Sequence, residues 1–244
     1  MVKKIIFILI AVSLLAYLLI AVIYLNPKGK GETICNKVSV GIIDKQVNWS
    51  VKEIEIVRLL EKANIYPVGK KMAEIDTKKI EQLLEKNNLI KQAECYKTIS
   101  GGIKITVRHR TPILMVFTAI RNYYIDTEGK ILFVPANFSA YVPVATGNID
   151  DEFAQKQLYE FVLFLQKNKF WNEQIEQIYV DANKEIELTP RVGNHQILLG
   201  KIENYPENLA KLKLFYDKGL NEVGWNKYSK IDLKYKNQVV CTKI

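Results

Sequence analysis

The chain of 244 residues contains little of the chemistry that metal sites and disulfide frameworks need. It has two histidines and three cysteines, and neither a CxxC pair nor a His-rich tract occurs. Three cysteines are too few for a disulfide-dense scaffold, and a structural zinc site needs clustered Cys and His ligands. We therefore expect no metal ion and no bound cofactor.

Motifs of the common hydrolases and nucleotide-binding enzymes are also missing. HExxH, GxSxG, SxxK and GxxxxGK[ST] do not occur, which argues against the zinc-hydrolase, serine-hydrolase, penicillin-binding and P-loop classes. A glycosidase needs two carboxylates across a cleft, one of them with a raised pKa. The carboxylates here, such as Glu152, Glu173 and Glu187, lie in polar, charged stretches and are expected on a solvated surface. The sequence therefore predicts that the protein is not an enzyme.

The charge is basic but spread along the chain. Lys and Arg number 35 against 26 Asp and Glu, which gives a formal net charge of +9. Because no stretch concentrates the positive charge, we expect no nucleic-acid partner. Since no catalytic motif occurs, we also expect no small-molecule substrate. With 48% apolar and 25% charged residues, the composition is that of a folded chain long enough for one large domain or two small ones.

One long apolar run is present near the N-terminus. Residues 5–25 contain no charged side chain, and a helix of 21 residues is about 31 Å long, enough to cross a hydrocarbon core of roughly 30 Å. A cleaved signal peptide is the alternative, but its apolar region is usually shorter and ends at a small-x-small site. We predict a retained single-pass transmembrane helix at residues 5–25, with a cytoplasmic tail at residues 1–4 and the C-terminal body outside. We expect Cys35, Cys95 and Cys241 to be small buried side chains, and a disulfide between two of them is the alternative.

Two folded bodies follow a linker at residues 26–33. Residues 34–110 show a β-α-α-β-β pattern: a strand, two amphipathic helices, and two alternating runs around Gly101-Gly102. The first helix is predicted to begin with a capping box formed by Ser50 and Glu53.

Residues 111–244 have the pattern of a mostly antiparallel β domain with flanking helices. A hairpin is predicted around residues 126–129, helices over residues 151–167 and from Pro206 to Gly219, and strands near residues 175–181, 185–189 and 195–199. One last strand is predicted over residues 231–241. The fold class is therefore α+β, with one N-terminal transmembrane helix and two domains.

A β-α-α-β-β body directly after a single transmembrane helix is the layout of a POTRA domain. The sequence within and after this body resembles the FtsQ/DivIB bacterial cell-division family, in its Bacteroidetes-like form. The resemblance covers the whole chain and is carried by short stretches in order: IKQAECYK at 90–97, the Gly101-Gly102 turn, IKITV at 103–107, RTPI at 110–113, YIDTEG at 124–129, PVATG at 143–147, ILLGK at 197–201, Lys211-Leu212 and IDLKY at 231–235.

The resemblance implies a non-enzymatic, bitopic membrane scaffold of the divisome. Its partners would be FtsB- and FtsL-like single-span division proteins and other divisome components, and it would help to control septal peptidoglycan synthesis. It would lie in the bacterial inner membrane at the septum, with its body in the periplasm. In the family the partner adds a strand beside the C-terminal strand, so the resemblance assigns partner binding to seven residues: Lys234, Tyr235, Lys236, Asn237, Gln238, Val239 and Val240.

The sequence leaves three alternatives open. One is a POTRA-containing outer-membrane protein assembly or secretion factor, although that class usually carries several POTRA repeats or a barrel. Another is a cryptic cell-wall hydrolase. The third is that Tyr235 is only a packed residue of the final strand.

Overall fold

The computed structural model describes residues 2–25, 33–43, 51–134 and 138–244, without the side chains of residues 2–9 and 23–25. Most of the predicted linker, residues 26–32, and the predicted N-cap Ser50 lie outside the described residues. The chain divides into two compact units, one formed mainly by residues up to Arg108 and the other mainly by residues from His109 onward. Each unit is described by itself.

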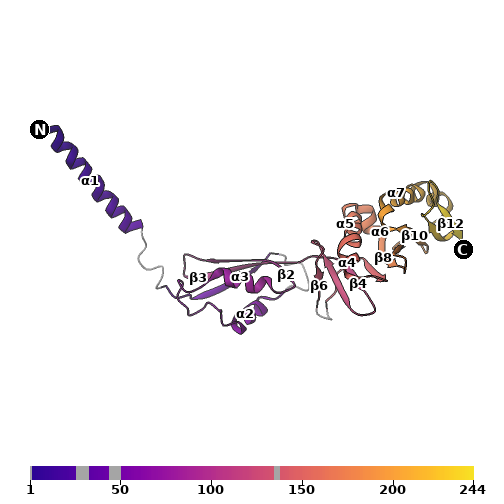
Figure 1. Cartoon of the computed structure of the whole chain (residues 1–244), viewed down its shortest axis with the longest axis horizontal. Helices are drawn as coiled ribbons and strands as arrows, with labels where there is room; N and C mark the ends of the chain where they lie inside the picture. The colour runs from indigo at the N-terminus through magenta and orange to yellow at the C-terminus, as the bar shows by residue number, and fades with distance from the viewer. Residues whose placement is uncertain (1, 26–32, 44–50, 135–137) are drawn as a thin grey trace. The chain divides into compact units, whose positions relative to one another are not determined.

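The N-terminal element is helix α1 (Val2–Leu25) (Figure 1). Its described side chains are almost all exposed, although a helix with apolar residues on every side and no polar stripe is normally buried in a protein core or a membrane. Counting only what the structure describes, no helix is both long and apolar enough to cross a bilayer.

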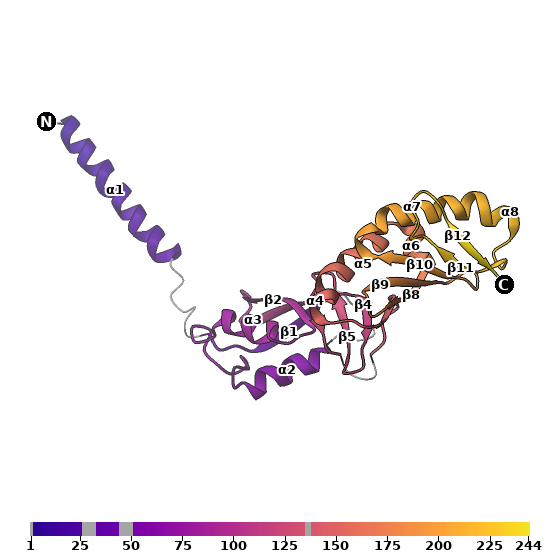
Figure 2. The ribbon, with the colours of Figure 1, turned by 45° about the vertical axis from the view of Figure 1, so that its right-hand side comes forward.

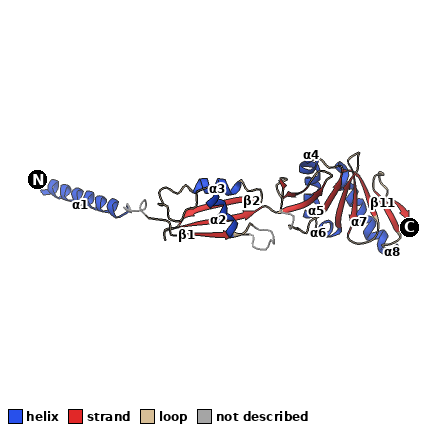
Figure 3. Cartoon of the chain, turned by 90° about the horizontal axis from the view of Figure 1, so that it is seen from below, coloured by secondary structure: helices blue, strands red, loops and turns tan. Residues whose placement is uncertain are grey.

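The first unit has the predicted β-α-α-β-β order. Its elements are β1 (Lys37–Ile42), α2 (Glu53–Lys62), α3 (Thr77–Glu85), β2 (Ile90–Lys97) and β3 (Gly102–His109). The sheet order is β1-β3-β2, and β1 is parallel to β3 (Figure 3). A parallel pairing needs a long connection between the strands, and here helices α2 and α3 lie between β1 and β3 in the chain.

Alternation of apolar side chains builds the core of this unit. Ile103, Ile105 and Val107 of β3 are at most 1% exposed, and both helices contribute fully buried apolar residues: Ile56, Leu60, Ile80 and Leu84. The predicted capping box is wrong in its position. Helix α2 begins at Glu53, and it is the Glu55 carboxylate that accepts a 3.2 Å hydrogen bond from the Lys52 N–H, two residues later than predicted.

The second unit is built on a sheet of nine strands in the order β12-β11-β10-β9-β8-β7-β4-β5-β6. Five of the eight pairings among its described strands are antiparallel. The strands in chain order are β4 (Pro112–Phe117), β5 (Asn122–Asp126), β6 (Ile131–Leu132), β7 (Val144–Gly147), β8 (Ile175–Val180), β9 (Glu185–Pro190), β10 (Gln196–Lys201), β11 (Tyr228–Asp232) and β12 (Val240–Lys243). The PVATG stretch contains β7. At its last residue, Gly147 (φ +106°), a Cβ would clash with the Val180 carbonyl.

Helical segments lie along the sheet of the second unit (Figure 2). They are α4 (Asp151–Phe153), the π-helical turn η1 (Ala154–Leu158), α5 (Tyr159–Lys167), α6 (Lys169–Gln174), the 3₁₀ turn η2 (Ile202–Asn204), α7 (Tyr205–Phe215), the π-helical turn η3 (Tyr216–Leu220) and α8 (Asn221–Val223). The helix predicted over residues 151–167 is present as α4, η1 and α5. The predicted end at Gly219 is wrong, because helical turns continue to Val223 and the glycine with positive φ is Gly224, at +92°.

The two histidines are both packed inside the protein, each 2% exposed. His109 accepts a hydrogen bond from the Val51 N–H at 3.0 Å. His195 bonds the Tyr216 hydroxyl at 2.7 Å and lies edge to face with the Tyr216 ring, 6.3 Å from the Trp225 ring centroid. This burial lowers the pKa of His195 from its usual 6.5.

A lowered pKa makes stability depend on pH in a stated direction. The unfolded chain protonates His195 as the pH falls through 6.5, while the folded chain takes up this proton only at a lower pH, because its pKa is lowered. The free energy of unfolding should therefore decrease as the pH is lowered from 6.5, by up to about 1.4 kcal/mol per pH unit for one proton. We expect urea unfolding of His195→Phe to lose this part of the slope between pH 6.5 and 5.5. Parallel slopes in the two proteins would contradict the assignment.

Candidate functional site

The C-terminal segment is a hairpin rather than the single strand that the sequence predicts over residues 231–241. Strand β11 ends at Asp232, residues 233–239 form a turn, and β12 begins at Val240. The two strands pair in antiparallel register, with Asp232 opposite Val240 and Ile231 opposite Cys241. Residues 233–239 are therefore not part of a strand, contrary to the prediction from the sequence, but connect the two strands of the hairpin.

Three interactions turn the chain away from the strand. The Asp232 carboxylate accepts a 2.9 Å hydrogen bond from the Lys234 N–H, and the Lys211 ammonium donates to the carbonyls of Leu233 and Tyr235 at 2.7 and 2.8 Å. Asn237 has φ +59°, in the left-handed region that asparagine tolerates better than most residues. The turn is thus fixed in part by hydrogen bonds from the ammonium group of Lys211 on α7.

Six of the seven residues predicted to bind a partner lie in this turn: Lys234, Tyr235, Lys236, Asn237, Gln238 and Val239. The seventh, Val240, begins β12. Tyr235 is 50% exposed, so it is not a packed core residue. Leu233, two residues before Tyr235 and just past the end of β11, is fully buried in the core.

Strand β12 lies at the margin of the nine-stranded sheet. Its only strand partner among the described residues is β11, so its other side has no strand beside it. Val240, Thr242 and Lys243 are exposed, and Cys241 is half-buried against the core. An edge of this kind presents backbone N–H and C=O groups to which another chain can add a strand.

A groove runs between the turn and α7. It consists of two adjoining cavities of about 390 and 560 Å³, with Glu207 and Lys211 lining both. The smaller is lined by Glu185, Leu199, Gly200, Lys201, Asn204, Glu207, Asn208, Lys211, Lys234 and Lys236, and the larger by Glu207, Lys211, Leu214, Phe215, Lys218, Gly219, Asn237, Gln238 and Val239. Five of the seven predicted residues therefore line this groove rather than a strand edge.

Lys234 is placed by contacts on β9 and β10. Its ammonium lies 3.2 Å from the Glu185 carboxylate, and its side-chain stem passes over Gly200, where a Cβ would come within 2.7 Å of Lys234 Cγ. The hydrogen bond to Glu185 raises the pKa of Lys234 above its usual value. Lys234, one of the residues that the family resemblance assigns to partner binding, is thus engaged within the chain, and a partner carboxylate would have to compete with Glu185.

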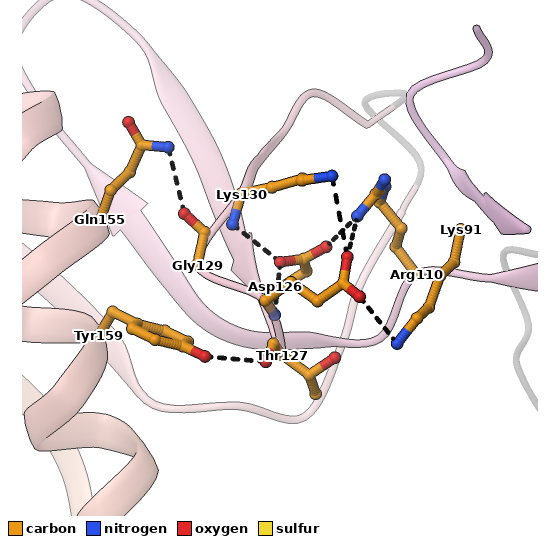
Figure 4. Close-up of polar contacts among 9 residues, drawn as sticks. Lys91, Arg110, Asp126, Thr127, Gly129, Lys130, Gln155 and Tyr159 are labelled. Carbon is orange, nitrogen blue, oxygen red and sulfur yellow. Dashed lines mark hydrogen bonds and ion pairs between the residues drawn. The ribbon is translucent and has the colours of Figure 1, made fainter. Parts of the chain in front are cut away.

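A second polar cluster explains two other family stretches, RTPI and YIDTEG (Figure 4). The Arg110 guanidinium donates to Asp126 at 2.8 Å and to Glu128 at 2.9 Å, and Lys91 bonds Glu128 at 3.0 Å. The Asp126 side chain is 1% exposed and also accepts from the N–H groups of Glu128 and Lys130, both at 2.8 Å. Hydrogen bonds from Lys91 and then Arg110 hold the pKa of Glu128 below its usual value.

The same cluster attaches the β5–β6 turn to the neighbouring helices. The Tyr159 hydroxyl donates to the Thr127 carbonyl at 2.9 Å, and the Gln155 amide donates to the Gly129 carbonyl at 3.1 Å (Figure 4). Gly129 has φ +75°, and a Cβ there would meet the Gln155 carbonyl oxygen. We interpret these residues as structural, because the acid and base groups neutralise one another and face no cavity of the groove.

Sequence reasoning missed the α7 wall of the groove and three of the four residues of β12. Asn237 was the available signal for the turn, because Asn favours left-handed turn positions. Leu214 gave a second signal, as an apolar residue on the polar side of α7 that is 56% exposed. Nothing local in the sequence indicates that Lys211 would reach the carbonyls of residues 233 and 235.

Comparisons with known proteins cover both units. A family model described as "FtsQ/DivIB, C-terminal related" matches residues 111–242, and a model described as a POTRA-like domain matches residues 33–108. Among solved structures, the major extracytoplasmic domain of the trans isomer of the cell-division protein DivIB from Geobacillus stearothermophilus is 14% identical, with a TM-score of 0.30, and the match covers 41% of this chain and 86% of that chain. No curated protein matches the chain.

Proposed function

Because the chain belongs to the FtsQ/DivIB C-terminal related family of bacterial cell-division proteins, we propose that it is a non-enzymatic scaffold that binds FtsB- and FtsL-type single-span partners. The observation that carries this proposal is the C-terminal hairpin, whose outer strand β12 has no strand on its far side within the described residues. Main-chain hydrogen bonds to a partner strand would supply docking, and the exposed side chains of the hairpin would supply selectivity.

The proposal includes a membrane anchor at residues 5–25 and domains at residues 34–110 and 111–244. The support for the anchor is the uncharged apolar run of 21 residues in the sequence, preceded by Lys3 and Lys4. Under this arrangement the folded body lies in the periplasm at the septum, where it helps to control peptidoglycan synthesis through its partners.

One observation at strand β2 of the first unit weighs against the alternative of an outer-membrane assembly factor, which would bind an unfolded client strand at a sheet edge. On this sheet-edge strand, the N–H groups of Ala93 and Cys95 are bound by carboxylates of α3, from Glu85 at 3.2 Å and Glu81 at 2.7 Å. An unfolded client strand would have to displace both carboxylates to pair there. The β12 margin carries no such carboxylate among the described contacts.

The test is a pull-down of the tagged full chain from detergent-solubilised membranes, followed by identification of bound single-span proteins. We expect Tyr235→Ala to reduce recovery of an FtsB-like partner by roughly tenfold or more, because a central aromatic contact is worth about 2 kcal/mol. Tyr235 is half exposed, so this variant should remain folded.

Lys234→Glu is expected to reduce recovery as well, since it removes a cation and repels Glu185. The matched control is Lys227→Glu, which makes the same charge change at an exposed lysine outside the groove. If both Tyr235→Ala and Lys234→Glu recover the partner as the wild type does, the docking site is not at this hairpin.

A further inference from the structure

The lining of the groove beside the hairpin has a net charge of +3, from five lysines against Glu185 and Glu207. Lys201, Lys218 and Lys236 line it, and none of them forms an ion pair or side-chain hydrogen bond within the described part of the chain. Lys211 and Lys234, by contrast, are engaged by backbone carbonyls and by Glu185. The groove therefore favours a ligand with more than one negative charge.

An apolar pocket adjoins these lysines. Leu214 is 56% exposed, and Phe215 and Val239 are partly buried against the core of the second unit. Lys211, Leu214 and Lys218 are spaced three and four residues apart, so they lie on one side of α7 and η3. An apolar side chain seated here would have a lysine on either side.

The dimensions fit a short peptide segment. From Glu207 to Lys218 the helix axis spans about 16 Å at 1.5 Å per residue, which is the length of about five extended residues at roughly 3.3 Å each. We propose that the groove binds a short acidic segment of a partner protein, with one apolar side chain in the pocket at Leu214, Phe215 and Val239. Its carboxylates would lie next to Lys236 and Lys218.

This inference rests on the proposed function and adds a second contact to it. Strand addition at β12 docks a partner mainly through backbone groups, and the groove would add a selection for acidic residues around an apolar one. A free inorganic anion would use the lysines without the apolar pocket. The arrangement of an apolar pocket between lysines therefore favours a peptide.

The test uses the purified full chain and a displayed library of random twelve-residue peptides. We expect selected peptides to contain Asp or Glu on both sides of a Leu, Ile or Phe. Fluorescence anisotropy with a selected peptide should show about tenfold weaker binding for Leu214→Asp and for the pair Lys218→Glu and Lys236→Glu. Raising the salt concentration should weaken wild-type binding, because the lysines are exposed.

Two control variants match these changes outside the groove. Ile120→Asp places the same charge on a residue that is 93% exposed, and Lys227→Glu matches the lysine changes. Selected peptides without acidic residues, or peptides that bind the groove variants as they bind the wild type, would overturn the proposal. If a β12 variant abolishes partner recovery from membranes while the groove variants do not change it, the groove proposal fails and the proposed function stands.

Discussion

A single proline on the outer side of β12 should reduce recovery of a single-span division partner by about 100-fold, which is ~2.7 kcal/mol. Proline removes the N–H that a partner strand would bind, and its ring obstructs the approach of that strand. A buried partner carbonyl left without its hydrogen bond adds roughly 1–3 kcal/mol to the loss. The full chain in detergent, with recovery quantified by mass spectrometry, provides the measurement.

Proline is placed at two adjacent positions of β12, Cys241 and Thr242, in separate variants, and one variant serves as the control for the other. Successive N–H groups of a strand point to opposite sides, so one proline acts on the outer side and the other breaks pairing with β11. Urea unfolding identifies them, because only the inward variant loses stability. The outward variant must fold as the wild type does and fail to bind; partner recovery at the wild-type level would exclude strand addition at β12.

Truncation from Ile231 is a poorer test of the same idea. Ile231 and Leu233 are fully buried, and β11 joins β10 to β12. Removing them exposes the core of the second unit, so loss of binding would follow from unfolding alone.

Arg110→Ala should lower the free energy of unfolding of the second unit by about 3–5 kcal/mol. Asp126 is 1% exposed, and Arg110 is the cation bonded to it. Removing the guanidinium leaves a buried carboxylate with only N–H donors around it, which is the unfavourable half of a broken buried ion pair. Urea unfolding at pH 7 measures the change.

Neighbouring positions separate this effect from a general loss of charge. Lys130 is 3.9 Å from Glu128 and 59% exposed, so Lys130→Ala should change stability by less than about 0.5 kcal/mol. Asp126→Asn combined with Arg110→Ala should recover part of the loss, because no buried charge then remains. A loss below about 1 kcal/mol for Arg110→Ala would show that water replaces the guanidinium.

Local patterns in the sequence determined most of the elements of both units. The alternation of Ile103, Ile105 and Val107 defines β3, and the apolar period over residues 151–167 defines α4, η1 and α5. Such patterns fix which side of each element is buried, because a strand repeats every two residues and a helix every 3.6. The short stretches that indicate the family are local as well: Gly129 and Gly147 are required by a turn and by a close approach of backbone.

Only the tertiary structure decided how these elements meet. The order β12-β11-β10-β9-β8-β7-β4-β5-β6 places β4 beside β7 and β10 beside the C-terminal β11, which no local pattern specifies. The chain leaves the sheet after β11, where the Lys211 ammonium binds the carbonyls of the residues 22 and 24 positions further along the chain. Period and turn chemistry act over a few residues, whereas the groove and the position of β12 at the margin of the described sheet exist only because distant segments are brought together by the shared core.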